Sequence, residues 1–296
     1  LAQVYTQQQN FDSAISEYEK AIEKDPKFVD SYISLSAVYL QKGDQNKAID
    51  TLQKAIDTIP NSAKLHNALG EMYIAIREYE KSLNQFNKAI SIDPKYENAY
   101  LNLGDYYSRK RQFDKALAMY RSALNANAKS VNAHFRIANI YALQEKIPLV
   151  EAEYKAIISI DPKNVSARTA LGNIYINQNK LKEAITEFEQ ALENAPNSLP
   201  IYLTLGELYN KAEEYDKAIS ISEKLGRFIL PEEEFAKASQ EAKNISASIR
   251  EAKATISGIA YYGKGIFMEA IRNFQQAIAL NPNSPITRYR LGLAYA

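Results

Sequence analysis

The chain has 296 residues, with 36 lysines and arginines against 35 aspartates and glutamates, so its formal net charge is +1. A field this weak would not draw the protein to nucleic acid or to an anionic membrane. Cysteine is absent, which excludes disulfides, thiolate metal sites and a cysteine nucleophile, and no stretch approaches the roughly 18 uninterrupted apolar residues that indicate a membrane span.

A tyrosine recurs at a fixed interval along almost the whole chain. Seven tyrosines follow one another every 34 residues: Tyr5, Tyr39, Tyr73, Tyr107, Tyr141, Tyr175 and Tyr209. The interval widens to 52 residues at Tyr261 and returns to 34 at Tyr295, which indicates one insertion of 18 residues. A fixed period in this range predicts one small structural unit that is copied and stacked, each copy burying its apolar face against its neighbours.

Other residue types recur in phase with this tyrosine, which is taken as position 11 of each repeat. Position 8 is small throughout: Ala2, Ser36, Gly70, Gly104, Ala138, Gly172, Gly206, Gly258 and Gly292. Position 20 is nearly always small: Ala14, Ala48, Ser82, Ala116, Val150, Ala184, Ala218 and Ala270. Position 24 is usually aromatic, with two departures: Tyr18, Leu52, Phe86, Tyr120, Tyr154, Phe188, Ser222 and Phe274. Position 32 is usually proline: Pro26, Pro60, Pro94, Pro162, Pro196 and Pro282.

This pattern predicts two helices per repeat. Positions 4, 7, 8 and 11 form one amphipathic stripe, and positions 20, 24 and 27 form another. Small residues at positions 8 and 20 let the two backbones approach closely, and the proline ends the second helix. The expected repeats are 1–28 (partial), 29–62, 63–96, 97–130, 131–164, 165–198, 199–230, 251–284 and 285–296 (partial), all in one solenoid over 1–296. Because both ends fall inside a repeat, we expect the chain to be an excerpt of a longer protein.

The insertion is expected to form a long helix over 231–250 that continues into the next repeat. Pro231 suits the first turn of a helix, and the three glutamates after it lie where the helix dipole favours negative charge. No Gly or Pro follows until Gly258. A helix unbroken from Pro231 to Tyr262 would be about 48 Å long at 1.5 Å per residue.

This long helix carries an apolar seam with heptad spacing: Phe235, Ala238, Ala242, Ile245, Ile249, Ala252, Ile256 and Ile259. In one interpretation the seam packs on its own solenoid. In the other its first half overhangs and offers 235–256 to a partner or to a second copy, which would allow self-association. Alanine at three seam positions makes a weak coiled coil and favours the first interpretation.

The phased residues resemble the tetratricopeptide repeat family, in which an aromatic-Leu-Gly-Tyr helix precedes an Ala-aromatic-Ala-Pro helix. The resemblance covers essentially the whole chain, with departures at Ala128, Val150, Ile157 and after Ser222. It implies an all-α, right-handed superhelical solenoid of helix-turn-helix repeats, whose first helices line a concave groove.

The sequence contains no recognisable active site. It has no phosphate loop, zinc-binding histidine-glutamate helix or nucleophile elbow, so we expect no catalytic residue, no metal and no cofactor. The only histidines, His66 and His134, both occupy position 4, which is an inter-helix packing position in the family.

The candidate site is a peptide-binding groove formed by positions 2, 5, 6 and 9 of the first helices, which cannot pack on the second helix of their own repeat. Asparagine suits an extended peptide, because its amide both donates to and accepts from a main chain. The candidate residues are Asn67, Glu71, Asn98, Asn102, Asp105, Asn132, Phe135, Arg136, Asn139, Asn173 and Glu207. The family's clamp for a chaperone's C-terminal carboxylate is not matched, because Glu71 and Asp105 place negative charge where the carboxylate would lie.

We therefore expect a non-catalytic scaffold that binds a protein or an extended peptide, with no nucleic acid and no membrane contact from this span. The alternatives are a substrate-recruiting arm of a larger enzyme such as a glycosyltransferase, a chaperone-tail receptor, and an assembly module of a bacterial envelope or secretion complex. The compartment is not indicated: for a bacterial protein, cytoplasm and periplasm both fit.

Overall fold

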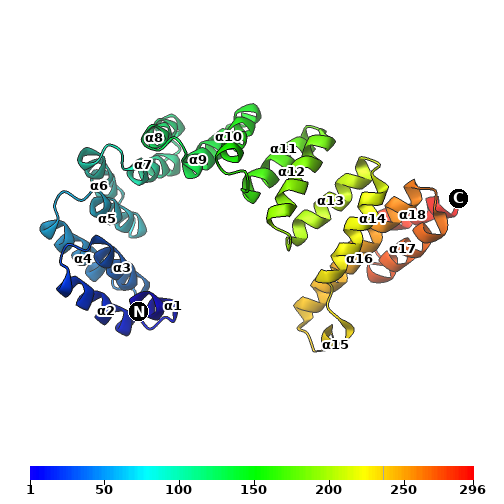
Figure 1. Ribbon diagram of the computed structural model, residues 1–296, viewed down its shortest axis with the longest axis horizontal. Coiled ribbons are helices and arrows are strands. Elements are labelled where there is room, and N and C mark those ends of the chain that lie inside the picture. The colour runs from blue at the N-terminus through cyan, green and yellow to red at the C-terminus, as the bar shows by residue number, and fades with distance from the viewer. Residues whose placement is uncertain (236) are drawn as a thin grey trace. The chain divides into compact units, whose positions relative to one another are not determined.

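The computed structural model describes residues 1–235 and 237–296 (Figure 1). Helices, turns and bends make up this part of the chain, and it contains no strand. The chain separates into two compact units, Leu1–Val150 (unit 1) and Glu151–Ala296 (unit 2), which are described one at a time. The expected all-α architecture of stacked helix pairs is confirmed.

Unit 1 consists of consecutive antiparallel helices, each packed against the next. Its helices are α1 (Ala2–Gln7), α2 (Phe11–Lys24), α3 (Val29–Gln41), α4 (Gln45–Thr58), α5 (Ala63–Ala75), α6 (Tyr79–Ile92), α7 (Glu97–Arg109), α8 (Phe113–Ala126), α9 (Val131–Leu143) and the start of α10 (Ile147–Ile160). From α3 to α8 the first helix of each repeat has 13 residues and the second has 14. The first helices of successive repeats also touch, α3 with α5, α5 with α7 and α7 with α9.

Unit 2 keeps the same order until its repeat is interrupted. After the rest of α10 it contains α11 (Val165–Asn177), α12 (Leu181–Asn194), α13 (Leu199–Lys211), α14 (Tyr215–Lys224), the 3₁₀ helix η1 (Leu225–Phe228), α15 (Glu232–Phe235), α16 (Gln240–Gly263), α17 (Phe267–Leu280) and α18 (Pro285–Tyr295). Helix α16 packs against both α14 and α17, and it also touches the two first helices that flank it, α13 and α18.

The turn inside each repeat is built the same way every time. The recurrent tyrosine offers its carbonyl to the N–H five residues later, as in Tyr73 O with Glu78 N at 2.8 Å and Tyr175 O with Lys180 N at 2.8 Å. This bond requires a left-handed residue at position 15. Only Gly43 and Gly265 meet that need with glycine, whereas the other turns use Gln9, Arg77, Arg111, Glu145, Asn179 and Glu213 at φ of 57° to 65°.

The close approach of the two helices occurs where the small residues predict it. A Cβ added to Gly70 would lie 2.5 Å from the Phe86 ring, and one added to Gly172 would lie 2.7 Å from the Phe188 ring. Phe86 is fully buried, so the aromatic ring of position 24 fills the space that the glycine leaves open. The position 20 alanines are fully buried as well.

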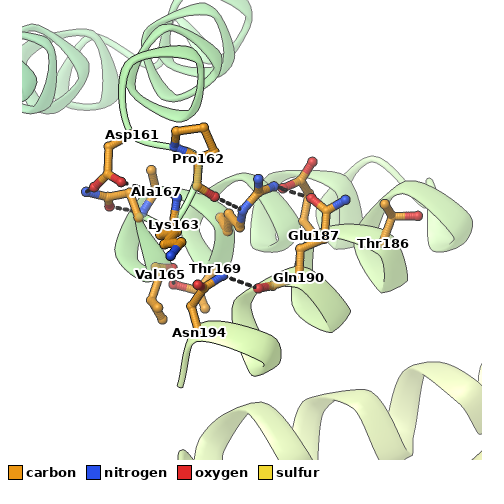
Figure 2. A network of polar contacts seen from close by, with 12 residues as sticks. Asp161, Pro162, Lys163, Val165, Ala167, Thr169, Thr186, Glu187, Gln190 and Asn194 are labelled. Atoms are coloured by element: carbon orange, nitrogen blue, oxygen red, sulfur yellow. Dashed lines mark hydrogen bonds and ion pairs between the residues drawn. The ribbon is translucent and has the colours of Figure 1, made fainter. Parts of the chain in front are cut away.

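Position 4 ties several repeats to the turn before them. Its side chain donates to the carbonyl of the proline six residues earlier, as Tyr32 Oη does to Pro26 at 3.2 Å and Arg168 Nε does to Pro162 at 2.9 Å. Arg168 is 8% exposed, and its guanidinium contacts Pro162 O, Glu187 and Gln190, three residues labelled in Figure 2; the ion pair with Glu187 has a length of 2.7 Å. The buried guanidinium is thus neutralised and hydrogen-bonded.

His66 follows the same rule, which agrees with its expected packing role. It is 5% exposed, and its ring nitrogens lie 3.3 Å from Pro60 O and 2.7 Å from Gln85 Oε1. His134, at the same position of another repeat, is half-buried.

The expected unbroken helix from Pro231 is wrong in its first part. Helix α15 ends at Phe235, residue 236 of the expected helix lies outside the described residues, and α16 begins only at Gln240. Ser239 explains the new start, because its Oγ accepts a hydrogen bond from Ala242 N at 3.3 Å and caps the helix. Helix α16 extends from Gln240 to Gly263 and is continuous across Gly258. Its 24 residues span about 36 Å at 1.5 Å per residue.

The repeat after the insertion fills the space left in the seventh repeat, which lacks the aromatic residue at position 24. Position 24 of the seventh repeat is Ser222, which is fully buried and lies 2.7 Å from Ser257 of α16, Oγ to Oγ. A Cβ added to Gly206 would meet Ile256 Cδ1 at 2.7 Å, so Ile256 of the following repeat fills the place of the missing ring. Asn210 Nδ2 secures this contact by donating to Ile256 O at 3.0 Å.

Part of the apolar seam packs within its own unit, as the first interpretation expects. Ile249 and Ile256 are each 4% exposed and belong to the core of unit 2, whereas Ile245 is 52% exposed. The segment before α16 lies against the same unit, since Leu230 N donates to Ser246 Oγ at 3.1 Å.

Candidate functional site

The predicted groove residues lie on the first helices, but they fall into both units. Asn173 on α11 and Glu207 on α13 belong to unit 2, and the other nine belong to α5, α7 and α9 of unit 1. The residues of each unit are therefore described within that unit.

Three of the unit 1 residues form one hydrogen-bonded cluster between α5 and α7. Asn102 Nδ2 donates to Asn67 Oδ1 at 2.9 Å and to Glu71 Oε1 at 2.7 Å, and Asn67 Nδ2 donates to the same Glu71 oxygen at 3.0 Å. Asn67 is 4% exposed. The cluster therefore joins two repeats, and its amides already bind one another.

A second cluster joins α7 to α9 in the same manner. Arg136 Nε donates to both carboxylate oxygens of Asp105, at 2.9 and 3.1 Å. Tyr120 Oη donates to Asp105 Oδ1 at 2.7 Å. Burial, followed by the hydrogen bond to Asp105, raises the pKa of the Tyr120 hydroxyl far above its usual range. Asp105 is thus a neutralised carboxylate between two donors.

Both clusters contain the same kind of side-chain pair between successive repeats, and we call these pairs the ladder. An acid at position 9 of one repeat accepts from the side chain at position 6 of the next repeat, as Glu71 does from Asn102 and Asp105 does from Arg136. The separation along the chain is 31 residues in both cases. The ladder pairs charges and amides that the sequence places on the same face.

The remaining predicted residues are available to a ligand to different degrees. The side chains of Asn98, Asn132, Asn139 and Asn173 are exposed, and Phe135 is half-buried. Asn139 and Asn173 make no side-chain hydrogen bond or ion pair with any residue that the structure describes.

Unit 2 contains a pocket of about 580 Å³ on the face of its first helices. Its lining comes from α13, α16 and α18: Leu203, Glu207, Asn210, Lys211, Ser248, Glu251, Ala252, Thr255, Ile256, Ile259 and Arg290. Most of these residues occupy positions 2, 5, 6 and 9, so the pocket is the groove of this unit. Its floor is largely aliphatic.

The pairing of positions 9 and 6 that forms the ladder in unit 1 is absent at this pocket. The residue at position 6 of the repeat after Glu207 is Ile256, and the acid that would precede Arg290 is Ile259. Neither Glu207 nor Arg290 makes a hydrogen bond or ion pair within the described part of the chain. Burial lowers the pKa of the Arg290 guanidinium, and no carboxylate counters this shift. Arg290 is a partly desolvated cation without a partner.

The sequence prediction included Glu207 but missed Arg290, Ile256 and Ile259. The signal was present, because the 34-residue phase resumes after the insertion and assigns these residues to positions 6 and 9. Glu207 is the last predicted groove residue before the insertion, and the same positions continue beyond it.

Residues 1–235 and 237–296 contain neither a group of side chains suited to a metal ion nor a helix suited to a membrane. No group of three or more His, Asp or Glu side chains is placed to hold a metal ion in these two ranges. Within the same ranges, none of the helices combines the length and the apolar character that crossing a membrane requires.

Comparison with solved structures places the fold among repeat proteins. The C-terminal part of a TPR repeat-containing protein from Cytophaga hutchinsonii is 11% identical, with a TM-score of 0.52 over 98% of each chain. PilF of Pseudomonas aeruginosa is 18% identical, with a TM-score of 0.53 over 74% of this chain and 97% of its own. A chain of the APC/C hetero-tetramer Cut9–Hcn1 is 19% identical with a TM-score of 0.47, and this chain spans about half of it, 53%, while 97% of this chain is covered.

Comparison with family models agrees over most of the sequence, whereas no curated protein matches it. Models described as tetratricopeptide repeat match 58–129, 101–165 and 153–186. A model described as TPR repeat matches 2–43, 37–76, 172–212 and 258–296. The matches leave 213–257 uncovered, which is the stretch that contains the insertion. Repeat period, paired helices and family models agree, and the chain belongs to the tetratricopeptide repeat family.

Proposed function

We propose that this chain is a non-catalytic protein-interaction scaffold that binds an extended segment of a partner in the groove of its first helices. The tetratricopeptide fold supports a scaffold role in general. The finer assignment rests on one observation: the pocket of about 580 Å³ in unit 2 lies on the face formed by positions 2, 5, 6 and 9.

The chemistry of that face suits a peptide main chain. Exposed amides at Asn132, Asn139 and Asn173 can each donate and accept, and an extended peptide brings main-chain groups that have no partner of their own. The amides of Asn67 and Asn102 contribute less, because they are already bound to Glu71. They serve to join the repeats.

Selection of peptides tests the groove directly. A displayed library of random peptides about ten residues long, which would extend over about 33 Å, is selected against the intact chain. The affinity of each selected peptide is then measured by fluorescence anisotropy for the wild type, for an Asn132→Ala, Asn139→Ala, Asn173→Ala variant and for Arg290→Glu. We expect peptides whose affinity falls in at least one of these first-helix variants.

The matched control changes the second-helix face. Lys88 is exposed on α6, so Lys88→Ala should leave every affinity unchanged. Peptides that weaken with Lys88→Ala and ignore all first-helix variants would contradict the proposed function.

A further inference from the structure

Unit 2 has a second pocket, between α16 and α17, that shares no lining residue with the groove pocket. We propose that this pocket binds a tyrosine side chain of a partner protein. The tyrosine would occupy the place that other repeats fill with their own position 4 side chain. The site is separate from the groove and goes beyond the proposed function.

Position 4 is large in seven repeats and small in one. In the repeat 251–284 it is Ala254, whereas elsewhere it has a large side chain with a polar tip: Tyr32, His66, Tyr100, His134, Arg168, Tyr202 and Arg288. Four of these side chains are buried, those of Tyr32, His66, Arg168 and Tyr202. The alanine therefore departs from a position that the other repeats fill themselves.

The position 4 side chain reaches positions 23 and 26 of the second helix in the same repeat. His66 Nδ1 lies 2.7 Å from Oε1 of Gln85, which holds position 23. The Arg168 guanidinium donates to Glu187 and Gln190, which hold positions 23 and 26. These two positions thus mark where the side chain belongs.

In the repeat 251–284 the same place is a pocket of about 390 Å³. Positions 23 and 26 are Asn273 and Gln276 of α17, and both line the pocket together with Ala254. Ala254 is 5% exposed and Leu280 is 40% exposed, so the pocket has a buried end and an open end. The complete lining is Ile229, Arg250, Lys253, Ala254, Asn273, Gln276, Ala279 and Leu280.

The insertion explains why this repeat has no large side chain of its own. Elsewhere the position 4 side chain donates to the carbonyl of a proline six residues earlier, as Tyr32 does to Pro26 at 3.2 Å. Six residues before Ala254 the chain has Ser248, which lies inside α16 and not in a turn. A side chain at this position has lost its usual acceptor, but the second-helix wall of its place is still present.

The polar groups of the pocket suit a hydroxyl. Lys253 is half-buried and makes no hydrogen bond or ion pair within the described part of the chain. Asn273 Nδ2 donates to Glu269 O at 2.9 Å, which leaves Asn273 Oδ1 as an acceptor. A tyrosine hydroxyl both accepts and donates, so it can satisfy the lysine and the amide oxygen together. Its ring would cover the apolar wall formed by Ile229 and Leu280.

The charges of the pocket argue against other polar side chains. Arg250 and Lys253 both line it, and none of the described lining residues is acidic, so an arginine would meet only like charge. At Arg168, by contrast, position 23 is an acid, Glu187. A carboxylate could accept from Lys253, but it has no proton to offer Asn273 Oδ1. Arg250 is already engaged, because its guanidinium donates to Leu230 O at 3.3 Å.

Filling the pocket from within tests the site. A displayed library of random peptides is selected against the intact chain and counter-selected against Ala254→Tyr, whose folding is checked by circular dichroism. We expect the remaining peptides to share a tyrosine and to bind Ala254→Tyr at least about tenfold more weakly than wild type. Ala252→Tyr is the matched control, because it adds the same side chain to α16 in the groove pocket and should leave these affinities unchanged.

Two further changes test the hydroxyl without adding bulk, and they apply even if Ala254→Tyr does not fold. Exchanging the peptide tyrosine for phenylalanine removes the hydroxyl, and Lys253→Met removes its donor. Each change alone should weaken binding about five- to tenfold, whereas Lys253→Met should have little further effect on the phenylalanine peptides.

The outcomes keep this inference separate from the proposed function. Peptides that weaken only with Ala252→Tyr would place binding in the groove, overturning this site and leaving the proposed function standing. Selected peptides that share arginine or histidine instead of tyrosine, or that are insensitive to Lys253→Met, would overturn the occupant. N-acetyl-tyrosinamide binding as tightly as the peptides would assign the pocket to a free small molecule and overturn the partner protein.

Discussion

Units 1 and 2 use the same two positions of the repeat in opposite ways. In unit 1, positions 9 and 6 of successive repeats hold Asp105 and Arg136, which bind each other at 2.9 Å. In unit 2 the same positions hold Ile259 and Arg290, and the arginine has no partner among the described residues. The role of an arginine at position 6 thus depends on the residue that the preceding repeat places at position 9.

The largest expected effect comes from restoring the family's aromatic residue where the chain has lost it. Ser222→Phe would place a ring where Ile256 already fills the space beside Gly206. Overpacking a complete core should lower the free energy of unfolding by about 1–3 kcal/mol, and the lost hydrogen bond to Ser257 adds about 1 kcal/mol. Thermal unfolding followed by circular dichroism measures the change.

Ser222→Ala is the control for this substitution. It adds no bulk and removes only the hydroxyl, which bonds Ser257 and also donates to Ile219 O, so it should cost about 1–2 kcal/mol. A Ser222→Phe variant as stable as the wild type would mean that Ile256 does not replace the ring.

The second prediction compares two glycine-to-alanine substitutions, one beside a buried aromatic ring and one beside an aliphatic side chain. Gly70→Ala in unit 1 drives a methyl group into the buried Phe86 ring, with a cost of about 1–3 kcal/mol. Gly206→Ala in unit 2 meets Ile256 Cδ1 at 2.7 Å and Cγ2 at 3.1 Å, and rotation about the terminal bond of Ile256 moves Cδ1, the nearer atom, away. The better helix propensity of alanine, about 1 kcal/mol, should then leave this variant near wild-type stability. Equal shifts in melting temperature would contradict the difference between the units.

The two ladder arginines should respond with opposite signs. Arg136→Met leaves Asp105 with only Tyr120 as a donor, and we expect a loss of about 1–2 kcal/mol. Arg290→Met removes a desolvated cation that has no partner, so the free energy of unfolding should rise by up to about 1 kcal/mol. Urea titration measures the free energy of unfolding of both variants. A loss of stability in both would show that Arg290 has a structural partner.

The smallest effect concerns a feature that both units share. Arg77 in unit 1 adopts φ of 65°, so Arg77→Gly should stabilise the chain by about 0.5–1 kcal/mol. Gly265 in unit 2 has φ of 74°, and Gly265→Ala should destabilise it by about 1 kcal/mol. Shifts of the same sign in both variants would refute a common turn conformation.

The regular part of the fold follows from the sequence because it depends on periodicity alone. The small residues at position 8 and the rings at position 24 recur in phase, and the structure brings Gly70 against Phe86 as this spacing predicts. The position 4 histidine His66 is likewise buried where packing was expected. Both results need only the repeat and the size of each side chain.

The rest depends on contacts that periodicity does not specify. The repeat period brings position 9 of one repeat next to position 6 of the next, but whether the two side chains bond, as Asp105 and Arg136 do, depends on their identities and conformations. The start of α16 depends on Ser239, whose cap competes locally with a longer helix. The peptide-binding role of the predicted asparagines remains a prediction.

The replacement of a ring by Ile256 also has a consequence for folding cooperativity. In a regular repeat the second helix packs against the first helix of the same repeat. One repeat can therefore unfold locally while its neighbours stay folded. Here the space beside Gly206 is sealed by the following repeat, and the buried Ser222–Ser257 contact joins the same two repeats. Residues 199–280 should therefore open together in native-state hydrogen exchange, as one block within an otherwise graded array.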